Sequence, residues 1–242
     1  MARRILERAT VTGADGSVDP GDLVAIAEDF PFVEFGILLS KNRKGGYRFP
    51  SIEWLEDLDG ICSSGANLVL SGHICGHWVR DICLGGSKFF CDLDPAWKMF
   101  DRFQLNFHAE SHKVSLAGLK KVLSDHLGAE RQVILQQDGV NNFFFSALSN
   151  SSEIDVVPLF DSSGGAGKVP GSWPKAVPGV CCGYAGGLSP DNLEDQLEMI
   201  SAVAGSGAIW IDAETHLRSK DDAIFDLAKV RRFLEIAEKW II

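Results

Sequence analysis

The sequence predicts an α/β protein with a single domain over residues 1–242, folded as one (β/α)₈ barrel, also called a TIM barrel. Its length of 242 residues is close to the ~250 that is typical of this fold. Short β-rich runs alternate with amphipathic stretches along the whole chain, a pattern that is typical of a parallel sheet covered by helices. No linker divides the chain into two parts.

The predicted strands are short apolar runs. Several of them are continuously hydrophobic, as expected when both faces of a parallel strand are covered. They span Ala9–Gly13, Val33–Leu39, Leu68–Gly72, Phe103–Phe107, Val133–Gln137, Val156–Phe160, Val180–Tyr184 and Ala208–Ile211.

Amphipathic stretches between these runs predict the helices. The first has Asp19 as its N-cap and Pro20 in its first turn, both favoured at these positions. The last is the clearest, because apolar residues recur on one face of it. The predicted helices span Pro20–Ala27, Ser51–Leu58, Trp78–Leu84, Pro95–Phe100, Leu116–Leu127, Asn142–Leu148, Asn192–Ala204 and Ile224–Trp240.

An open, doubly wound sheet is the competing architecture. It normally carries a G-x-G-x-x-G turn after the first strand. The corresponding string here, Val11-Thr12-Gly13-Ala14-Asp15-Gly16, does not match that pattern. The barrel is therefore favoured.

Composition limits the classes of partner. The net charge is −10, from 23 basic and 33 acidic residues, so neither nucleic acid nor an anionic membrane is an expected partner. The six cysteines form no CxxC pair and are expected as reduced thiols. No signal peptide and no membrane span is recognisable, which favours the cytoplasm. The expected partner is a small-molecule substrate; a homodimer through an exposed helix stays open.

The active site of a (β/α)₈ barrel lies at the carboxyl ends of its strands. Polar residues follow almost every predicted strand and form a pool of candidates. They are Thr12, Asp15, Ser40, residues 41–48, His73, Cys75, His77, Asn106, His108, Glu110, Gln136, Gln137, Asp138, Asp161, Tyr184, Asp212 and Glu214.

Two glycine-rich loops give the sharpest signals. Asp161 stands at the tip of a buried strand and leads into Ser162-Ser163-Gly164-Gly165-Ala166-Gly167-Lys168. Glycines let backbone N–H groups approach an anion closely. The second loop, Tyr184-Ala185-Gly186-Gly187-Leu188-Ser189-Pro190-Asp191-Asn192, follows the seventh strand, where barrels commonly bind phosphate. These loops predict a pocket for a phosphate ester.

The same strings resemble the phosphoribosylanthranilate isomerase family. FDSSGGAGK is similar to its aspartate-then-GGTGK loop, and AGGLSPDN to its AGGL(T/S)PxN phosphate loop. Residues 47–51 are weakly similar to the segment after the second strand of the family. The match covers roughly residues 156–195, with a looser match through the last helix.

The resemblance implies an Amadori-type aldose–ketose isomerisation of a sugar phosphate, a step of tryptophan biosynthesis, without a cofactor. It implies that Asp161 is the general acid and that four glycines hold the phosphate: Gly165, Gly167, Gly186 and Gly187. The arginine that follows the second strand of the family would be Arg48, or Arg43 in another register. The general base is left open among Thr12, Asp15, Asp138 and His108, and Glu214 is expected to contact the substrate.

Two positions depart from the family pattern. Thr12 stands where the family has its cysteine base, and a threonine hydroxyl is a far poorer base than a thiolate. Asp212 and Glu214 replace a small Ser-Ser-Gly turn after the eighth strand. Two carboxylates would repel a phosphate unless Lys168, Arg218 or a metal intervenes.

The histidines suggest a metal site as an alternative. His73, His77 and His108, with Asp138 or Glu214, are ligand types that suit Zn²⁺. Their spacing matches no motif such as H-E-x-x-H, so we expect hydrogen-bonding roles and no metal. Two other functions stay open: a diverged barrel enzyme with different chemistry, and a ligand-binding barrel without catalysis.

Overall fold

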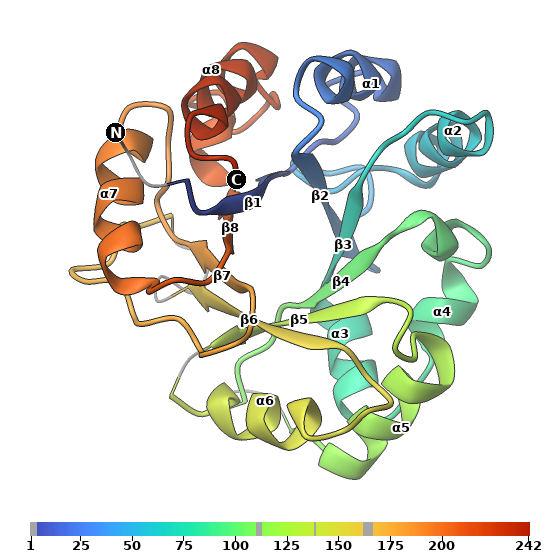
Figure 1. The fold of residues 1–242 in the computed structure, drawn as a ribbon. Helices are drawn as coiled ribbons and strands as arrows, with labels where there is room; N and C mark the ends of the chain where they lie inside the picture. Colours follow the sequence, from blue (N-terminus) through green and yellow to red (C-terminus); the bar gives the residue numbers. More distant parts are fainter. Residues whose placement is uncertain (1–3, 110–112, 138, 162–166) are drawn as a thin grey trace.

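The computed structural model describes residues 4–109, 113–137, 139–161 and 167–242. Eight parallel strands pair in chain order and close into a barrel, with the helices outside (Figure 1). The closing pair is β1 with β8, where Thr10 lies opposite Asp212. The predicted fold class, a (β/α)₈ barrel, is confirmed.

The strands agree with the predicted runs to within about two residues at most ends. They are β1 (Leu6–Thr12), β2 (Val33–Ser40), β3 (Leu70–Cys75), β4 (Arg102–Leu105), β5 (Gln132–Gln137), β6 (Val156–Asp161), β7 (Cys182–Ala185) and β8 (Ile209–Ala213).

The helices cover the outer face of the barrel. They are α1 (Pro20–Asp29), α2 (Ile52–Ser63), α3 (Gly76–Cys83), α4 (Lys88–Asp92), α5 (Leu116–His126), α6 (Asn141–Ser149), α7 (Leu193–Val203) and α8 (Leu227–Glu238), with 3₁₀ turns η1 (Ala96–Met99) and η2 (Thr215–Leu217). Asp19 caps α1 as predicted, accepting from the Gly21 amide. None of the described helices is long and apolar enough to cross a membrane.

The connection between β3 and β4 differs from the prediction. One helix was predicted at Pro95–Phe100; the structure has the short helix α4 and the 3₁₀ turn η1. The reason is packing of aromatic rings: Phe89 and Phe90 are buried and contact Phe103 of the next strand edge-on. A helix of five residues is too short to show a periodic pattern.

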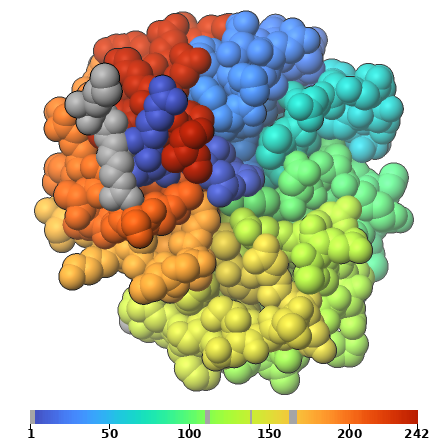
Figure 2. All heavy atoms as spheres, viewed as in Figure 1, coloured from blue at the N-terminus to red at the C-terminus, as the bar shows by residue number. Residues whose placement is uncertain are grey.

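The two chain ends meet beneath the barrel. The amides of Ile5 and Leu6 both donate to the carbonyl of Trp240 at 2.9 Å. In turn, the Ile242 amide donates to the carbonyl of Leu6. Figure 2 shows the last residues, in red, against the first strand, in blue. The end of the barrel opposite the carboxyl ends of the strands is thereby fixed.

The barrel interior is divided into an apolar and a polar half. Ile134, Val157, Leu159, Ala185 and Trp210, from β5 to β8, form a small apolar cluster separate from the main core. The other half holds ionic and polar groups. Glu34 of β2 accepts from the guanidinium of Arg102 of β4 at 2.5 and 2.7 Å, and the Thr10 hydroxyl also donates to it. This buried pair is compensated on all sides, as a buried charge requires.

We predict that the interior around β1 and β2 tolerates no added atom. A Cβ at Gly36 would lie 2.1 Å from the Thr12 Oγ1 and 2.9 Å from the His73 ring. Gly36→Ala should therefore lower the free energy of unfolding by about 1–3 kcal/mol. Gly60→Ala is the matched control, because nothing lies within 4 Å of its Cβ in helix α2. The free energy of unfolding of the control should rise by about 0.5–1 kcal/mol, because alanine has a higher helix propensity than glycine. Urea unfolding measures both, and equal midpoints would contradict the packing described.

Candidate active site

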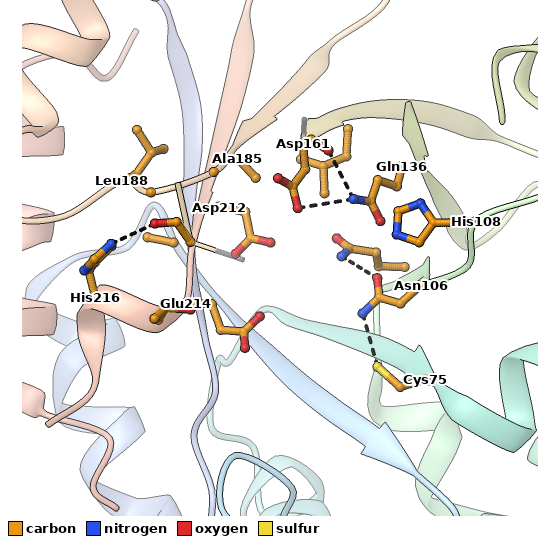
Figure 3. Close-up of a pocket in the computed structure, with 17 residues that line it drawn as sticks. Cys75, Asn106, His108, Gln136, Asp161, Ala185, Leu188, Asp212, Glu214 and His216 are labelled. Atoms are coloured by element: carbon orange, nitrogen blue, oxygen red, sulfur yellow. Dashed lines mark hydrogen bonds between the residues drawn. The ribbon is translucent and has the colours of Figure 1, made fainter. Parts of the chain in front are cut away.

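A cavity of about 250 Å³ opens among the carboxyl ends of the strands. Side chains from β3 through β8 line it, together with the loops after β6, β7 and β8. Figure 3 shows carboxylates in its middle, an amide-rich wall on one side and the β7 and β8 loops on the other. The cavity thus lies at the end of the barrel where this fold carries catalysis.

Two carboxylates stand at one level of this cavity. Asp161 ends β6 and Asp212 lies in β8, and Ala185 of β7 is in register with both. Neighbouring strands are about 4.8 Å apart, so the two Cα atoms are separated by roughly 10 Å. The methyl group of Ala185 leaves the space between the carboxylates open to a ligand.

Burial keeps Asp212 protonated at neutral pH. Its side chain is removed from water, which raises the pKa of this carboxyl to about 8, with Glu214, Glu34 and Asp161 acting in the same direction. The Thr12 hydroxyl donates to its Oδ1 at 2.6 Å and opposes the shift only partly. One oxygen of Asp212 is therefore held by Thr12, and the carboxyl carries a proton that it can give to a ligand.

Asp161 is held from the neighbouring strand. The side-chain amide of Gln136 donates to its Oδ2 and to its backbone carbonyl, both at 3.2 Å. Gln136 is itself buried in β5. This contact presents Asp161 as a hydrogen-bond acceptor that faces the cavity (Figure 3).

Glu214 lines the same cavity but is paired. Arg48 donates from Nη1 to its Oε1 at 2.5 Å. Burial raises the pKa of the Glu214 carboxyl, and the Arg48 guanidinium opposes this. The Arg48 Nε also donates to both carboxylate oxygens of Asp222, at 2.7 and 2.8 Å. The arginine therefore compensates the carboxylate that the sequence indicated as a repulsive group.

Asp15 lies outside the cavity, in a buried network. Its Oδ1 accepts from the backbone and hydroxyl of Ser17, and its Oδ2 from the Arg48 amide at 2.6 Å and the Arg218 guanidinium at 2.8 Å. Every lone-pair direction of this carboxylate is thus used. The sequence indicated Asp15 as a candidate base; the structure gives it contacts that hold the loops after β1, β2 and β8 together.

The other predicted base candidates divide into two groups. Thr12 is fully buried and does not line the cavity, and its hydroxyl donates its hydrogen bond to Asp212. His108 lines the cavity beside Gln136 and Asp161 (Figure 3). Asp138 lies outside the described residues. Among the described candidates, His108 is therefore the one that can meet a ligand directly.

The predicted glycine loops reach the cavity where they are described. Gly167, Gly186 and Gly187 line it, whereas Gly165 lies outside the described residues. Gly187 has a φ of +67°, and a Cβ there would be 2.4 Å from the Val169 amide nitrogen. The side chain of Asn192 fixes this turn, donating to the Gly187 carbonyl and accepting from the Ser189 amide, both at 2.9 Å. Only glycine lets the two loops approach this closely.

The structure does not bring the three histidines of the metal alternative together. His73 is buried inside the barrel and lines no part of the cavity; burial lowers its pKa to about 4. His77 lies on α3 beside Asn42. Within the described ranges, no group of three or more His, Cys, Asp or Glu side chains is placed to hold a metal ion.

Two contributors to the cavity were not recognised from the sequence for what they do there. Asp212 was in the candidate pool but was singled out only as an obstacle to phosphate, because nothing local shows that Thr12, 200 residues away, bonds to it. Gln104 was not a candidate, since it lies inside a strand and not at its end. Its place in an otherwise apolar interior run, Phe103-Gln104-Leu105, was the available signal.

Fold and cavity together define a closed (β/α)₈ barrel with a polar, carboxylate-bearing mouth. Solved structures with this fold include phosphoribosylanthranilate isomerase from Thermotoga maritima, at a TM-score of 0.56 and 12% identity over 97% of this chain and 100% of that one. A structure of a phosphoribosylanthranilate isomerase in complex with reduced 1-(o-carboxyphenylamino)-1-deoxyribulose 5-phosphate gives a TM-score of 0.55 and 14% identity with the same coverage.

A citrate lyase from Burkholderia xenovorans gives a TM-score of 0.52 and 11% identity over 98% of this chain and 78% of that one. No protein-family model and no curated protein sequence matches the chain. The chain therefore shares the fold of phosphoribosylanthranilate isomerase, and identities this low establish the fold alone.

We predict that Asp212 makes folding stability depend on pH. Its pKa is about 8 in the folded state against an ordinary 3.8, so the folded state holds a proton that the unfolded chain has lost. This contribution to the free energy of unfolding falls as pH rises from about 4 to about 8 and is gone above that. Asp212→Asn keeps an oxygen for Thr12 and lacks the titration.

The free energy of unfolding of Asp212→Asn, relative to that of wild type, should rise by several kcal/mol between pH 5 and pH 8.5. The size follows from about 1.4 kcal/mol per pKa unit. Urea unfolding of both proteins at the two pH values measures this gain. Parallel pH dependence of the two proteins would contradict a buried, protonated Asp212.

Proposed function

We propose that this chain is an enzyme, an isomerase that moves a proton within a sugar-phosphate-like small molecule by acid–base catalysis. The observation that carries the proposal is the pair Asp161 and Asp212, at one level of the mouth on either side of Ala185. One carboxyl is held protonated and the other is held as an acceptor. Pairs of titratable groups in such different environments are typical of acid–base sites.

An aldose–ketose rearrangement needs these two roles. A proton must be given to the sugar oxygen while another is removed from the carbon next to the carbonyl or imine. Asp212 supplies the first proton and Asp161 accepts the second, and His108, which lines the same cavity, relays it to solvent. The family resemblance gives Asp161 the acid role; we assign that role to Asp212 because burial keeps its proton in place.

The phosphate belongs on the side of the cavity that Gly167, Gly186 and Gly187 line. Backbone N–H groups of glycine loops bind anions without a cationic side chain. Asp161, Asp212 and Glu214 line this cavity, but its negative charge is lower than three ionised carboxylates would give. Asp212 carries a proton, and Arg48 pairs with Glu214. The two carboxyl groups at the eighth strand, Asp212 and Glu214, are thereby compatible with an anionic ligand.

Deuterium exchange tests the proton transfer without a known product. The protein is incubated in D₂O with pentose 5-phosphates and their N-substituted aminodeoxy derivatives, and NMR follows loss of the proton at C2. We expect exchange with wild type, and a loss of about 10²–10⁴-fold in Asp161→Asn and in Asp212→Asn. Asp195→Asn, on the exposed face of α7, is the control and should keep full activity.

The exchange rate should also fall as pH rises through about 8, where Asp212 loses its proton. Exchange that is unaffected in both aspartate variants would exclude the proposed pair. Binding of a sugar phosphate without exchange would indicate a ligand-binding barrel without catalysis.

A further inference from the structure

The wall opposite the glycine loops is built from uncharged hydrogen-bonding groups. Gln104 and Asn106 of the β4 segment and Cys75 of β3 form it, and Figure 3 shows Asn106 and Cys75 on this side of the cavity. Burial raises the pKa of the Cys75 thiol to about 12, so this group is neutral at any physiological pH. The wall therefore offers a ligand dipoles and no charge.

The hydrogen bonds of this wall run in one direction. The Gln104 Nε2 donates to Asn106 Oδ1 at 2.7 Å, the Asn106 Nδ2 donates to Cys75 Sγ at 3.2 Å, and the thiol donates to the His73 carbonyl at 3.5 Å. Each donor fixes the orientation of the next group. The Gln104 Oε1 stands at the start of this chain of bonds and has no protein partner.

That oxygen is an unusual feature of a folded protein. Gln104 is 6% exposed, and a buried acceptor without a hydrogen bond destabilises the folded protein. Because Gln104 lines the cavity, a ligand that brings an O–H or N–H group satisfies this acceptor. The amide is held by Asn106 and cannot rotate to present its NH₂ group without losing the 2.7 Å bond.

Among the described residues, the cavity lining lacks what an aryl carboxylate would need. Its described lining contains no Lys, Arg, Phe, Tyr or Trp side chain, and the nitrogen-bearing rings are those of His108 and His216. Asp161, Asp212 and Glu214 are the acidic groups that such a ligand would face. The described lining therefore offers an anthranilate-like end neither a fixed cation nor an apolar plane.

We propose that the wall of Gln104, Asn106 and Cys75 binds the end of the substrate remote from the phosphate, and that this end is an uncharged, hydroxyl-bearing chain and not an aryl carboxylate. This inference rests on the proposed function, because it takes the glycine side as the phosphate end. The substrate is then a polyhydroxylated sugar phosphate whose distal hydroxyl donates to the Gln104 Oε1.

Two ligands that share the phosphate and differ at the other end test this. They are ribitol 5-phosphate and reduced 1-(o-carboxyphenylamino)-1-deoxyribulose 5-phosphate, titrated by calorimetry into wild type and variants. We expect ribitol 5-phosphate to bind at least about tenfold more tightly. Gln104→Met should lower the affinity for ribitol 5-phosphate by about tenfold. The affinity for the aryl ligand should stay within about twofold of wild type, since the aryl ligand makes no bond to Gln104.

Two further variants separate this effect from damage to the fold. Asn106→Ala, at a half-buried position, frees the Gln104 amide and should weaken ribitol 5-phosphate in the same direction. Gln137→Met is the matched control, because Gln137 is a neighbouring half-buried glutamine of β5 that does not line the cavity. It should change neither affinity.

Tighter binding of the aryl ligand, or ribitol 5-phosphate affinity that is equal in Gln104→Met and wild type, overturns the inference. If neither ligand binds, both the inference and the proposed function fail. If ribitol 5-phosphate binds through Gln104 but no sugar phosphate exchanges its proton in D₂O, the proposed function fails and the assignment of the wall holds.

Discussion

One hydrogen bond connects the closure of the barrel to the chemistry of its mouth: the Thr12 hydroxyl to the Asp212 carboxyl, at 2.6 Å across the β1–β8 seam. Closing the sheet at this seam buries both side chains, and burial is what keeps the proton on Asp212. Gly36 of the next strand has no Cβ and so leaves room for Thr12. The protonated carboxyl, the closure of the barrel and the space left by Gly36 thus depend on one another, since loosening the seam would hydrate the carboxyl and lower its pKa.

A second constraint holds the loops around the mouth. Arg48 and Asp222 both adopt left-handed backbone conformations, with φ of 70° and 62°, which are costly for residues with a Cβ. They are joined to each other, and through Arg218 to Asp15, by ion pairs. The pairs offset the backbone strain and place the Arg48 guanidinium on Glu214. Charged residues at strand ends therefore fall into two kinds: those whose oxygens are all used by the protein, and those that face the cavity.

The sequence was informative about the fold and less so about the site. Apolar runs predicted all eight strands, because a strand covered on both faces must be apolar whatever its partners are. Asp15 and Asp161 look alike in the sequence, since each follows a strand. What separates them is Arg218, which lies 203 residues from Asp15 and binds it. Gln104 was overlooked for a related reason: its importance comes from one unpaired oxygen, which no local pattern encodes.

The two departures from the family pattern are physically linked. Thr12 stands at the position that corresponds to the cysteine of the family that the loops resemble, and Asp212 lies where that family has its small turn. In this chain the two side chains bond to each other. A thiol at position 12 would be a weak donor to the buried carboxyl, and a small turn on β8 would leave the Thr12 hydroxyl without its acceptor. In this chain the two positions therefore form one hydrogen-bonded unit across the β1–β8 seam.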